Sequence, residues 1–179
     1  MTGGRSSKDL SRAALFGAAG VLLPVIFHAL HLGHVFMPMY LPLIALAFFA
    51  GPRAAAATGF LVPLLSGALT GMPPFYPPLA PVMALEIASM GGALATLRKG
   101  YPAANEWLLL IPVLLLGRVL NYGLTYAAAL LMDLPAGFLA GLSFLAGWPG
   151  LILITATVPP LVRSIAPNPA ATAGKNEEK

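Results

Sequence analysis

Long apolar stretches, separated by short gaps that hold most of the charges, are the main pattern along this chain. The apolar residues run continuously instead of alternating with polar ones, and several stretches approach the roughly 20 residues that a helix needs to cross a bilayer. Lipid leaves backbone groups no water to bind, so a span is either a helix or a strand of a closed barrel, and barrel strands alternate. The pattern therefore predicts an all-α, polytopic integral membrane protein.

We predict six spans, which form one membrane domain from residue 11 to residue 165 between an N-terminal segment, residues 1–10, and a disordered tail, residues 166–179. The predicted spans are Ser11 to Leu32, Met37 to Ala50, Ala54 to Thr70, Leu79 to Leu97, Glu106 to Met132 and Gly137 to Ile165. The second is short, so we expect it to be tilted, broken or partly buried. The sequence Gly51-Pro52-Arg53 separates it from the third, because it breaks a helix and adds a charge.

Basic residues occupy every second gap between the predicted spans. They are Arg5, Lys8 and Arg12 before the first span, Arg53 after the second, Arg98 and Lys99 after the fourth, and Arg163 at the end of the sixth. The other three gaps contain neither Lys nor Arg. Because basic loops stay on the cytoplasmic side, we predict a six-transmembrane-helix bundle with both termini in the cytoplasm.

The composition supports a membrane location and restricts the candidate partners and sites. Hydrophobic residues make up 58% of the chain and charged residues only 9%, too few for the surface of a soluble domain. The net charge of +4 follows from topology, so no nucleic-acid partner is needed. The basic N-terminus followed by an apolar run is similar to a secretory signal, but no convincing small-residue cleavage site follows. The absence of cysteine excludes disulfides and thiolate metal sites.

Arg118 lies deep inside the fifth predicted span, and Asn121, Tyr122 and Thr125 follow three, four and seven residues later. These spacings place the four side chains on one face of a helix. A charge at membrane depth costs several kcal/mol, so a cavity, a partner or a ligand must compensate it. We therefore predict that this face lines the functional site.

Glu86 is the other charge predicted to lie inside the membrane, in the fourth span. Two interpretations follow. Arg118 forms an internal ion pair with Glu86, or it presents its planar guanidinium to a substrate carboxylate while Glu86 binds a polar or cationic group of the same molecule. Both hold if the pair flanks the pocket.

His28, His31 and His34 follow one another at intervals of three near the outer end of the first span. Convergent imidazoles are typical of metal sites, but Gly33 is expected to end the helix before His34, and no acidic residue or cysteine is close in sequence. We therefore predict no metal. His31 and His34 are assigned to contacts with a polar ligand, and hydrogen bonding within the bundle is the alternative.

The gap between the third and fourth spans, residues 71–78, is uncharged and rich in proline and aromatic residues. Proline restricts the backbone, so we expect this segment to hold a defined shape. It either covers an outward-facing pocket or lies in the headgroup region with its aromatic rings as anchors. The residues assigned to this gating loop are Met72, Pro73, Pro74, Phe75 and Tyr76.

Small residues predict how the first span meets its neighbours. Ala14, Gly17 and Ala18 share a face, on which another helix backbone can approach closely. Docking of a partner subunit and ordinary packing within the bundle both explain this face. Gly67 with Gly71 and Gly137 with Gly141 repeat the spacing.

Catalytic motifs are not evident. The serines Ser66, Ser89 and Ser143 have no base in a recognisable motif, and the sequence contains no HExxH, nucleophile elbow or P-loop. We predict that the chain is not an enzyme, that it needs no cofactor, and that any ATP hydrolysis coupled to it occurs in partner subunits.

Several of these features together resemble the substrate-binding S components of energy-coupling factor (ECF) transporters, which are small six-helix membrane proteins. The resemblance extends over most of residues 11–165. It is carried by the small-residue face of the first span, by residues 37–42 (MPMYLP), by Gly51-Pro52 with the following Gly59, Pro63 and Ser66, by residues 69–74 (LTGMPP), and by Gly117-Arg118.

The resemblance implies that the chain captures a vitamin-like small molecule outside the cytoplasmic membrane of a bacterium or archaeon. It would then dock through its first helix on a membrane coupling subunit driven by two ATPase subunits. The pocket would lie near the outer side, at Glu86, Arg118, Asn121, Tyr122 and Thr125, beneath the gating loop. The N-terminal Met-His motif of the nickel and cobalt members is absent, which argues against a metal cargo.

Two other classes of protein are compatible with the sequence. One is a secondary transporter that works alone, although no inverted repeat is clear. The other is a membrane scaffold that uses the small-residue faces without a ligand. A scaffold would not require the polar face around Arg118. All three classes are in contact with membrane lipid.

Overall fold

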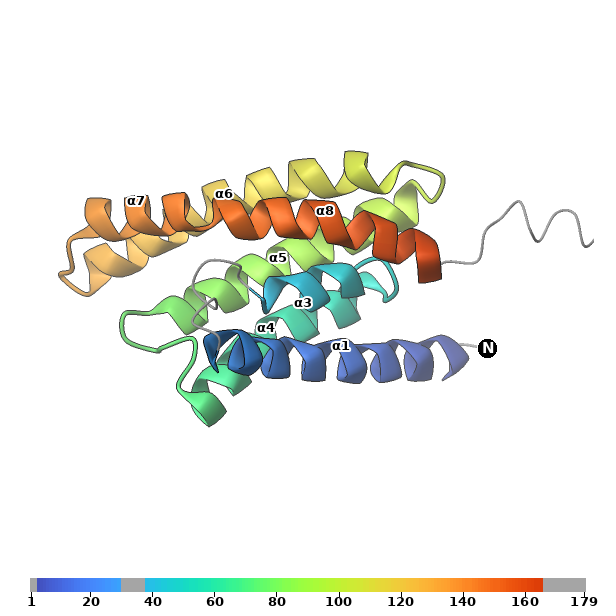
Figure 1. Cartoon of the computed structure of the whole chain (residues 1–179), viewed down its shortest axis with the longest axis horizontal. Helices are drawn as coiled ribbons and strands as arrows, with labels where there is room; N and C mark the ends of the chain where they lie inside the picture. Colours follow the sequence, from blue (N-terminus) through green and yellow to red (C-terminus); the bar gives the residue numbers. More distant parts are fainter. Residues whose placement is uncertain (1–2, 30–37, 166–179) are drawn as a thin grey trace, which may run out of the picture.

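The computed structural model describes residues 3–29 and 38–165, and the regular structure in these residues is entirely helical (Figure 1). The helices are α1 (Gly3–Ala29), α3 (Tyr40–Leu46), α4 (Pro52–Thr70), α5 (Leu79–Gly100), α6 (Glu106–Leu131), α7 (Ala136–Ala146) and α8 (Trp148–Ile165). The all-α prediction is confirmed. His31, His34 and the predicted disordered tail lie outside the described residues.

Within the described residues, five helical stretches are long and apolar enough to cross a membrane: Ser7–Ala29, Pro52–Thr70, Leu79–Gly100, Glu106–Leu131 and Ala136–Ile165. They leave many large apolar side chains on the outer surface; Leu108 and Leu116 on α6, for example, are 72% and 67% exposed. Extensive apolar exposure of this kind is unfavourable in water. The helices therefore have the length and composition of a multi-pass membrane protein.

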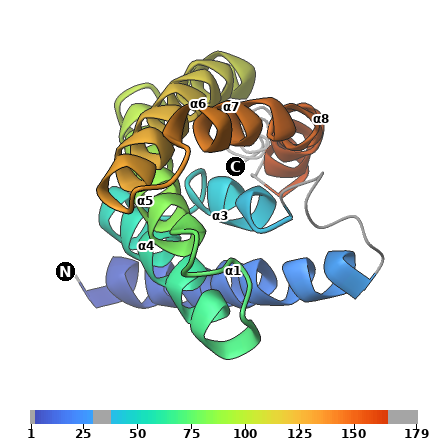
Figure 2. The ribbon, with the colours of Figure 1, turned by 90° about the vertical axis from the view of Figure 1, so that its left-hand side faces the viewer.

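The predicted second span, Met37 to Ala50, contains only the seven-residue helix α3 among its described residues. At about 1.5 Å per residue, this helix is too short to cross a bilayer. A series of turns with hydrogen bonds such as Phe48 N–H to Ala45 O (3.1 Å) follows it, and Gly51-Pro52 then begins α4. α3 is buried almost completely, between α1, α4, α5 and α8 (Figure 2). The described residues thus contain five helical stretches of spanning length where the sequence predicted six.

The predicted sixth span, Gly137 to Ile165, consists of two consecutive helices. α7 ends at Ala146, Gly147 follows as its C-cap, and α8 begins at Trp148. Pro149 lies in the first turn of α8, where its missing N–H has no helical partner to lose. The two helices follow one another along α6 in Figure 1.

Glycines bring the first helices close together. A Cβ on Gly17 of α1 would meet Thr58 and Val62 of α4 at 3.4 Å, and a Cβ on Gly59 of α4 would meet the backbone of Ile87 on α5 at 3.0 Å. Close approach of this kind is how helices pack in lipid. The backbones of α4 and α5 are consequently almost in contact at Ile87, the residue after the buried Glu86.

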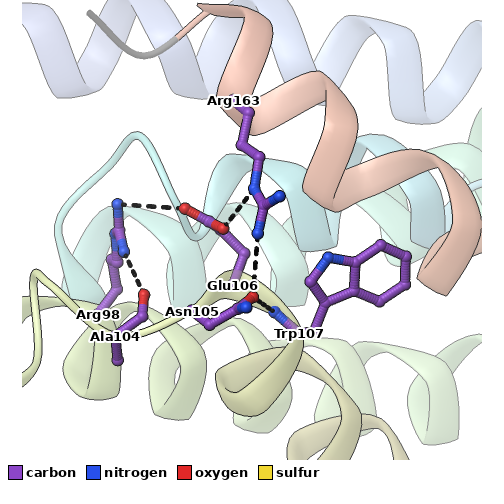
Figure 3. A network of polar contacts seen from close by, with 6 residues as sticks. All are labelled: Arg98, Ala104, Asn105, Glu106, Trp107 and Arg163. Carbon is purple, nitrogen blue, oxygen red and sulfur yellow. Dashed lines mark hydrogen bonds and ion pairs between the residues drawn. The ribbon is translucent and has the colours of Figure 1, made fainter. Parts of the chain in front are cut away.

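Basic side chains from separate parts of the chain gather at one end of the bundle. Lys8, Arg12, Arg98 and Lys99 line one cleft there. Nearby, Glu106 pairs with Arg163 (2.9 Å) and more loosely with Arg98 (3.8 Å), which links α8 to the α5–α6 connection (Figure 3). The N-terminal end of α1 and the C-terminal end of α8 lie at this same end of the molecule (Figure 1).

Candidate ligand-binding site

Glu86 on α5 is the centre of a polar cluster inside the bundle and has no exposed surface. Arg118 of α6 donates to its Oε1 at 2.6 Å, and the side-chain amide of Asn121 donates to its Oε2 at 2.7 Å. The hydroxyl of Tyr40, from α3, also donates to Oε2. A buried carboxylate needs both an opposite charge and hydrogen bonds to offset its lost hydration. This cluster supplies both and ties α3, α5 and α6 together.

The structure contains the internal ion pair that was one of the two interpretations of Arg118. The local packing explains why the two charges meet. Gly117 faces Met90 of α5 so closely that a Cβ at position 117 would lie 2.0 Å from the methionine Sδ. Without a side chain at Gly117, α6 approaches α5, and the next residue reaches Glu86. Two buried nitrogens of the guanidinium, Nε and Nη1, have no hydrogen-bond partner within residues 3–29 and 38–165.

A second layer of polar groups extends from this cluster. Ser143 of α7 donates from Oγ to Asn121 Oδ1 at 2.7 Å. This bond and the bond to Glu86 together orient the amide, because the carboxylate requires a donor and the serine hydrogen requires an acceptor. One turn further along α6, the buried hydroxyl of Thr125 has no hydrogen-bond partner in the part of the chain that the structure describes. Asn121 and Thr125 are 4% and 6% exposed.

Beside these groups the bundle contains a cavity of about 510 Å³, formed by residues of α1, α3, α5, α6, α7 and the connection between α4 and α5. Its volume lies within the range of small-molecule sites, about 300–1,000 Å³. One wall is polar and consists of Tyr40, Asn121, Thr125 and Ser143; most of the remaining lining is aliphatic, methionine or proline. Glu86 and Arg118 lie behind the polar wall and are not part of the lining.

The gating loop forms another wall of the cavity. Gly71 ends α4 with a φ of 75°, a conformation that favours glycine. Ser66 then donates to the carbonyl of Met72 at 2.7 Å, and the N–H of Ala80 donates to the carbonyl of Pro74 at 3.0 Å. Both ends of the loop are therefore held to the helices beside it.

Within the gating loop, Met72, Pro73 and Pro74 line the cavity, as do the following prolines Pro77 and Pro78. Phe75 and Tyr76 are not part of the lining and are 48% and 66% exposed. The prolines of the loop thus contribute to the cavity wall, whereas its two aromatic side chains are largely exposed outside the cavity.

The structure brings together most, but not all, of the predicted site residues. Glu86, Arg118, Asn121 and Thr125 are buried near one another, as the helical spacing indicated. Tyr122 is not with them; it is 41% exposed and its ring stacks on that of Tyr126. It lies at the edge of the polar face, where a large aromatic ring packs outside the bundle. Of the three histidines, His28 lines the cavity and His31 and His34 fall outside the described residues.

The small residues of α1 divide between two faces. Gly17 is buried against α4, so it takes part in packing within the bundle. Ala14 and Ala18 are exposed on the outer side of the helix. The predicted docking face therefore consists of the two alanines without the glycine.

Two members of the site, Tyr40 and Ser143, were not predicted from the sequence. Tyr40 belongs to the stretch MPMYLP that was noted only for its resemblance to a family, and a tyrosine in an apolar, proline-flanked segment needs a hydrogen-bond partner once it is buried. Ser143 was considered only as a nucleophile. Comparison with protein-family models, with curated proteins and with solved structures gives no match. The fold and the site together are those of an all-helical protein with five helical stretches suited to crossing a membrane among its described residues and a cavity of ligand size.

Proposed function

We propose that this chain is a membrane-embedded subunit that captures a small molecule and delivers it to an energising partner, in the manner of an ECF S component. The observation that carries the proposal is the cavity of about 510 Å³ with a buried polar wall, on which the hydroxyl of Thr125 has no hydrogen-bond partner among the described residues. Buried polar groups are normally satisfied, so this wall is suited to a ligand. A scaffold has no use for such a cavity.

The proposed orientation follows from charge. The end of the bundle that carries Lys8, Arg12, Arg98, Lys99 and Arg163 is assigned to the cytoplasm, by the positive-inside rule. The cavity lies toward the opposite end, beside the loop that follows α4, and is thus assigned to the outer side of a bacterial or archaeal cytoplasmic membrane. In the six-crossing topology, the segment that contains α3 returns the chain between α1 and α4. Both termini are then cytoplasmic.

The outer face of α1 is proposed as the docking surface for the membrane coupling subunit, with two ATPase subunits supplying the energy. α1 contacts the rest of the protein mainly through α3 and α4. Ala14 and Ala18 are exposed, so a partner helix is able to approach there without rearrangement of the bundle. The cavity and this surface belong to largely different parts of the molecule.

The decisive experiment is to purify the chain from its own cells, extract it and identify small molecules that copurify by mass spectrometry. A stoichiometric small molecule supports capture. Uptake driven by an ion gradient in vesicles that contain this chain alone would instead indicate a secondary transporter. Neither ligand nor uptake would indicate a scaffold and contradict the proposal.

Docking is tested separately with Ala18→Trp. We expect this variant to bind the copurified molecule with unchanged affinity and to lose most of the uptake measured in cells, because the bulky ring occupies the partner's place. Leu116→Trp, on α6 at a position that is already large and 67% exposed, is the matched control away from α1 and should retain uptake. Equal loss of binding and uptake in Ala18→Trp would indicate a packing role.

A further inference from the structure

The chemistry of the cavity wall restricts the class of ligand. The two buried charges nearest to the cavity, Glu86 and Arg118, neutralise each other at 2.6 Å and are 0% and 2% exposed. Each oxygen of the carboxylate already accepts at least one hydrogen bond. A ligand carboxylate would add a second anion beside a single arginine, and a ligand cation would meet a carboxylate that is already paired. Arg118, whose Nε and Nη1 have no hydrogen-bond partner among the described residues, does not line the cavity, and neither does Glu86. The pair is therefore not positioned to contact a ligand in the cavity directly.

The lining itself supplies no carboxylate from Asp or Glu and no Lys or Arg among its described residues, and His28 of α1 is its only basic side chain. A cation that moved into this cavity would lose hydration without meeting a carboxylate. An anion would meet only His28, which belongs to α1 and not to the polar wall on α6 and α7. The ligand group that fits beside Asn121, Thr125 and Ser143 is therefore neutral.

The polar wall nevertheless offers hydrogen bonds of both kinds. Asn121 uses one amide hydrogen for Glu86, which leaves the second available. Ser143 donates its only hydrogen to Asn121 and still accepts. The unpartnered hydroxyl of Thr125 both donates and accepts. These three side chains form one compact group on α6 and α7.

The rest of the cavity is apolar. Besides prolines, aliphatic residues and methionines line it, including Met39, Val82, Met83, Leu139 and Leu142. Methionine adapts to ligand shape without a polar partner. We infer, on the basis of the proposed function, that the captured molecule is uncharged and amphipathic. It has an apolar body and one terminal group that both donates and accepts a hydrogen bond, such as a carboxamide, a lactam or an alcohol. That group binds Asn121, Thr125 and Ser143.

Three probes of matched shape test this inference: cyclohexylacetamide, cyclohexylacetate and cyclohexylethylammonium. Their affinities are measured by ligand-observed NMR titration against the full chain in nanodiscs, with empty nanodiscs as the control for partitioning into lipid. We expect the amide to bind about tenfold more tightly than either ion, which corresponds to one satisfied hydrogen bond. An ion that binds as tightly as the amide would overturn the inference.

Thr125→Val removes the unpartnered hydroxyl at nearly constant volume and should reduce amide affinity by about three- to tenfold. Thr157→Val is the matched control, because Thr157 bonds to the carbonyl of Leu153 within α8 and does not line the cavity. Unchanged amide affinity in Thr125→Val would contradict the assignment of the polar wall.

The two proposals fail in different ways. If a charged small molecule copurifies with the chain and binds it, the ligand class inferred here is wrong and capture stands. If nothing copurifies and none of the three probes binds, both proposals are wrong.

Discussion

Two glutamate–arginine clusters lie at different depths of this bundle. Glu86 and Arg118 are buried between α5 and α6, whereas Glu106 pairs with Arg98 and Arg163 at the basic end (Figure 3). The side chain of Arg163 is 54% exposed and that of Arg118 only 3%. The same pair of residue types therefore occurs in two settings: the partly exposed cluster joins α8 to the α5–α6 connection at the surface, and the buried one joins α3, α5 and α6 inside the bundle.

Arg118→Met should have the largest effect, because it leaves a buried carboxylate without its counter-charge. We expect the free energy of unfolding to fall by about 3–5 kcal/mol, measured by SDS titration of the protein in detergent micelles. Adding Glu86→Gln to this variant should restore most of the loss, since the uncompensated charge is then gone. An equal loss in the single and double variants would show that the pair acts through packing alone.

Tyr40→Phe should have an intermediate effect. It removes one of the three donors to Glu86 and keeps the ring, so the expected loss is about 1.5–3 kcal/mol, typical of a hydrogen bond to a charged group. Tyr122→Phe is the control: its ring is partly exposed and contacts Tyr126 and Phe144 without a role in the cluster. A similar loss in both variants would contradict the importance of the third donor.

Glu106→Gln should have the smallest effect, about 1 kcal/mol or less, because its partners are partly exposed and water screens them. Raising the salt concentration should reduce the difference from the unmodified protein further. The same unfolding titration, repeated at low and high salt, measures it. A loss as large as that of Arg118→Met would remove the distinction between the two clusters.

The sequence predicted the long helices well. Their limits follow from local signals: Gly51-Pro52 begins α4, Gly71 ends it, and Asn105 caps α6 by accepting from the N–H of Trp107 at 3.0 Å. The length of the apolar segments between these ends is the signal that predicts helical spans. The segment Met37 to Ala50 was predicted as a short span that would be tilted, broken or partly buried, and its described residues contain the short, buried helix α3, as suits an apolar stretch of this length.

The sequence left long-range pairing open: it gave the Glu86–Arg118 pair as one of two interpretations and did not indicate Tyr40 as a further partner. Helical spacing placed Arg118, Asn121 and Thr125 on one face, but it carries no information on which residue of another helix lies opposite. Glu86 is separated from Arg118 by 32 positions, and Tyr40 from Glu86 by 46. The exposed position of Tyr122 depends on the rotation of α6 within the bundle, which is set by the close contact at Gly117.

The ion pair between α5 and α6 also has a consequence for how the chain enters the membrane during synthesis. The two helices are consecutive, and only residues 101–105 separate them. A helix that entered lipid alone with Glu86 ionised would incur a penalty of several kcal/mol. If both helices leave the translocon as a hairpin, the carboxylate meets its counter-charge before either side chain faces the lipid. Because α6 directly follows α5 in the sequence, Arg118 is synthesised soon after Glu86 and is then available to pair with it.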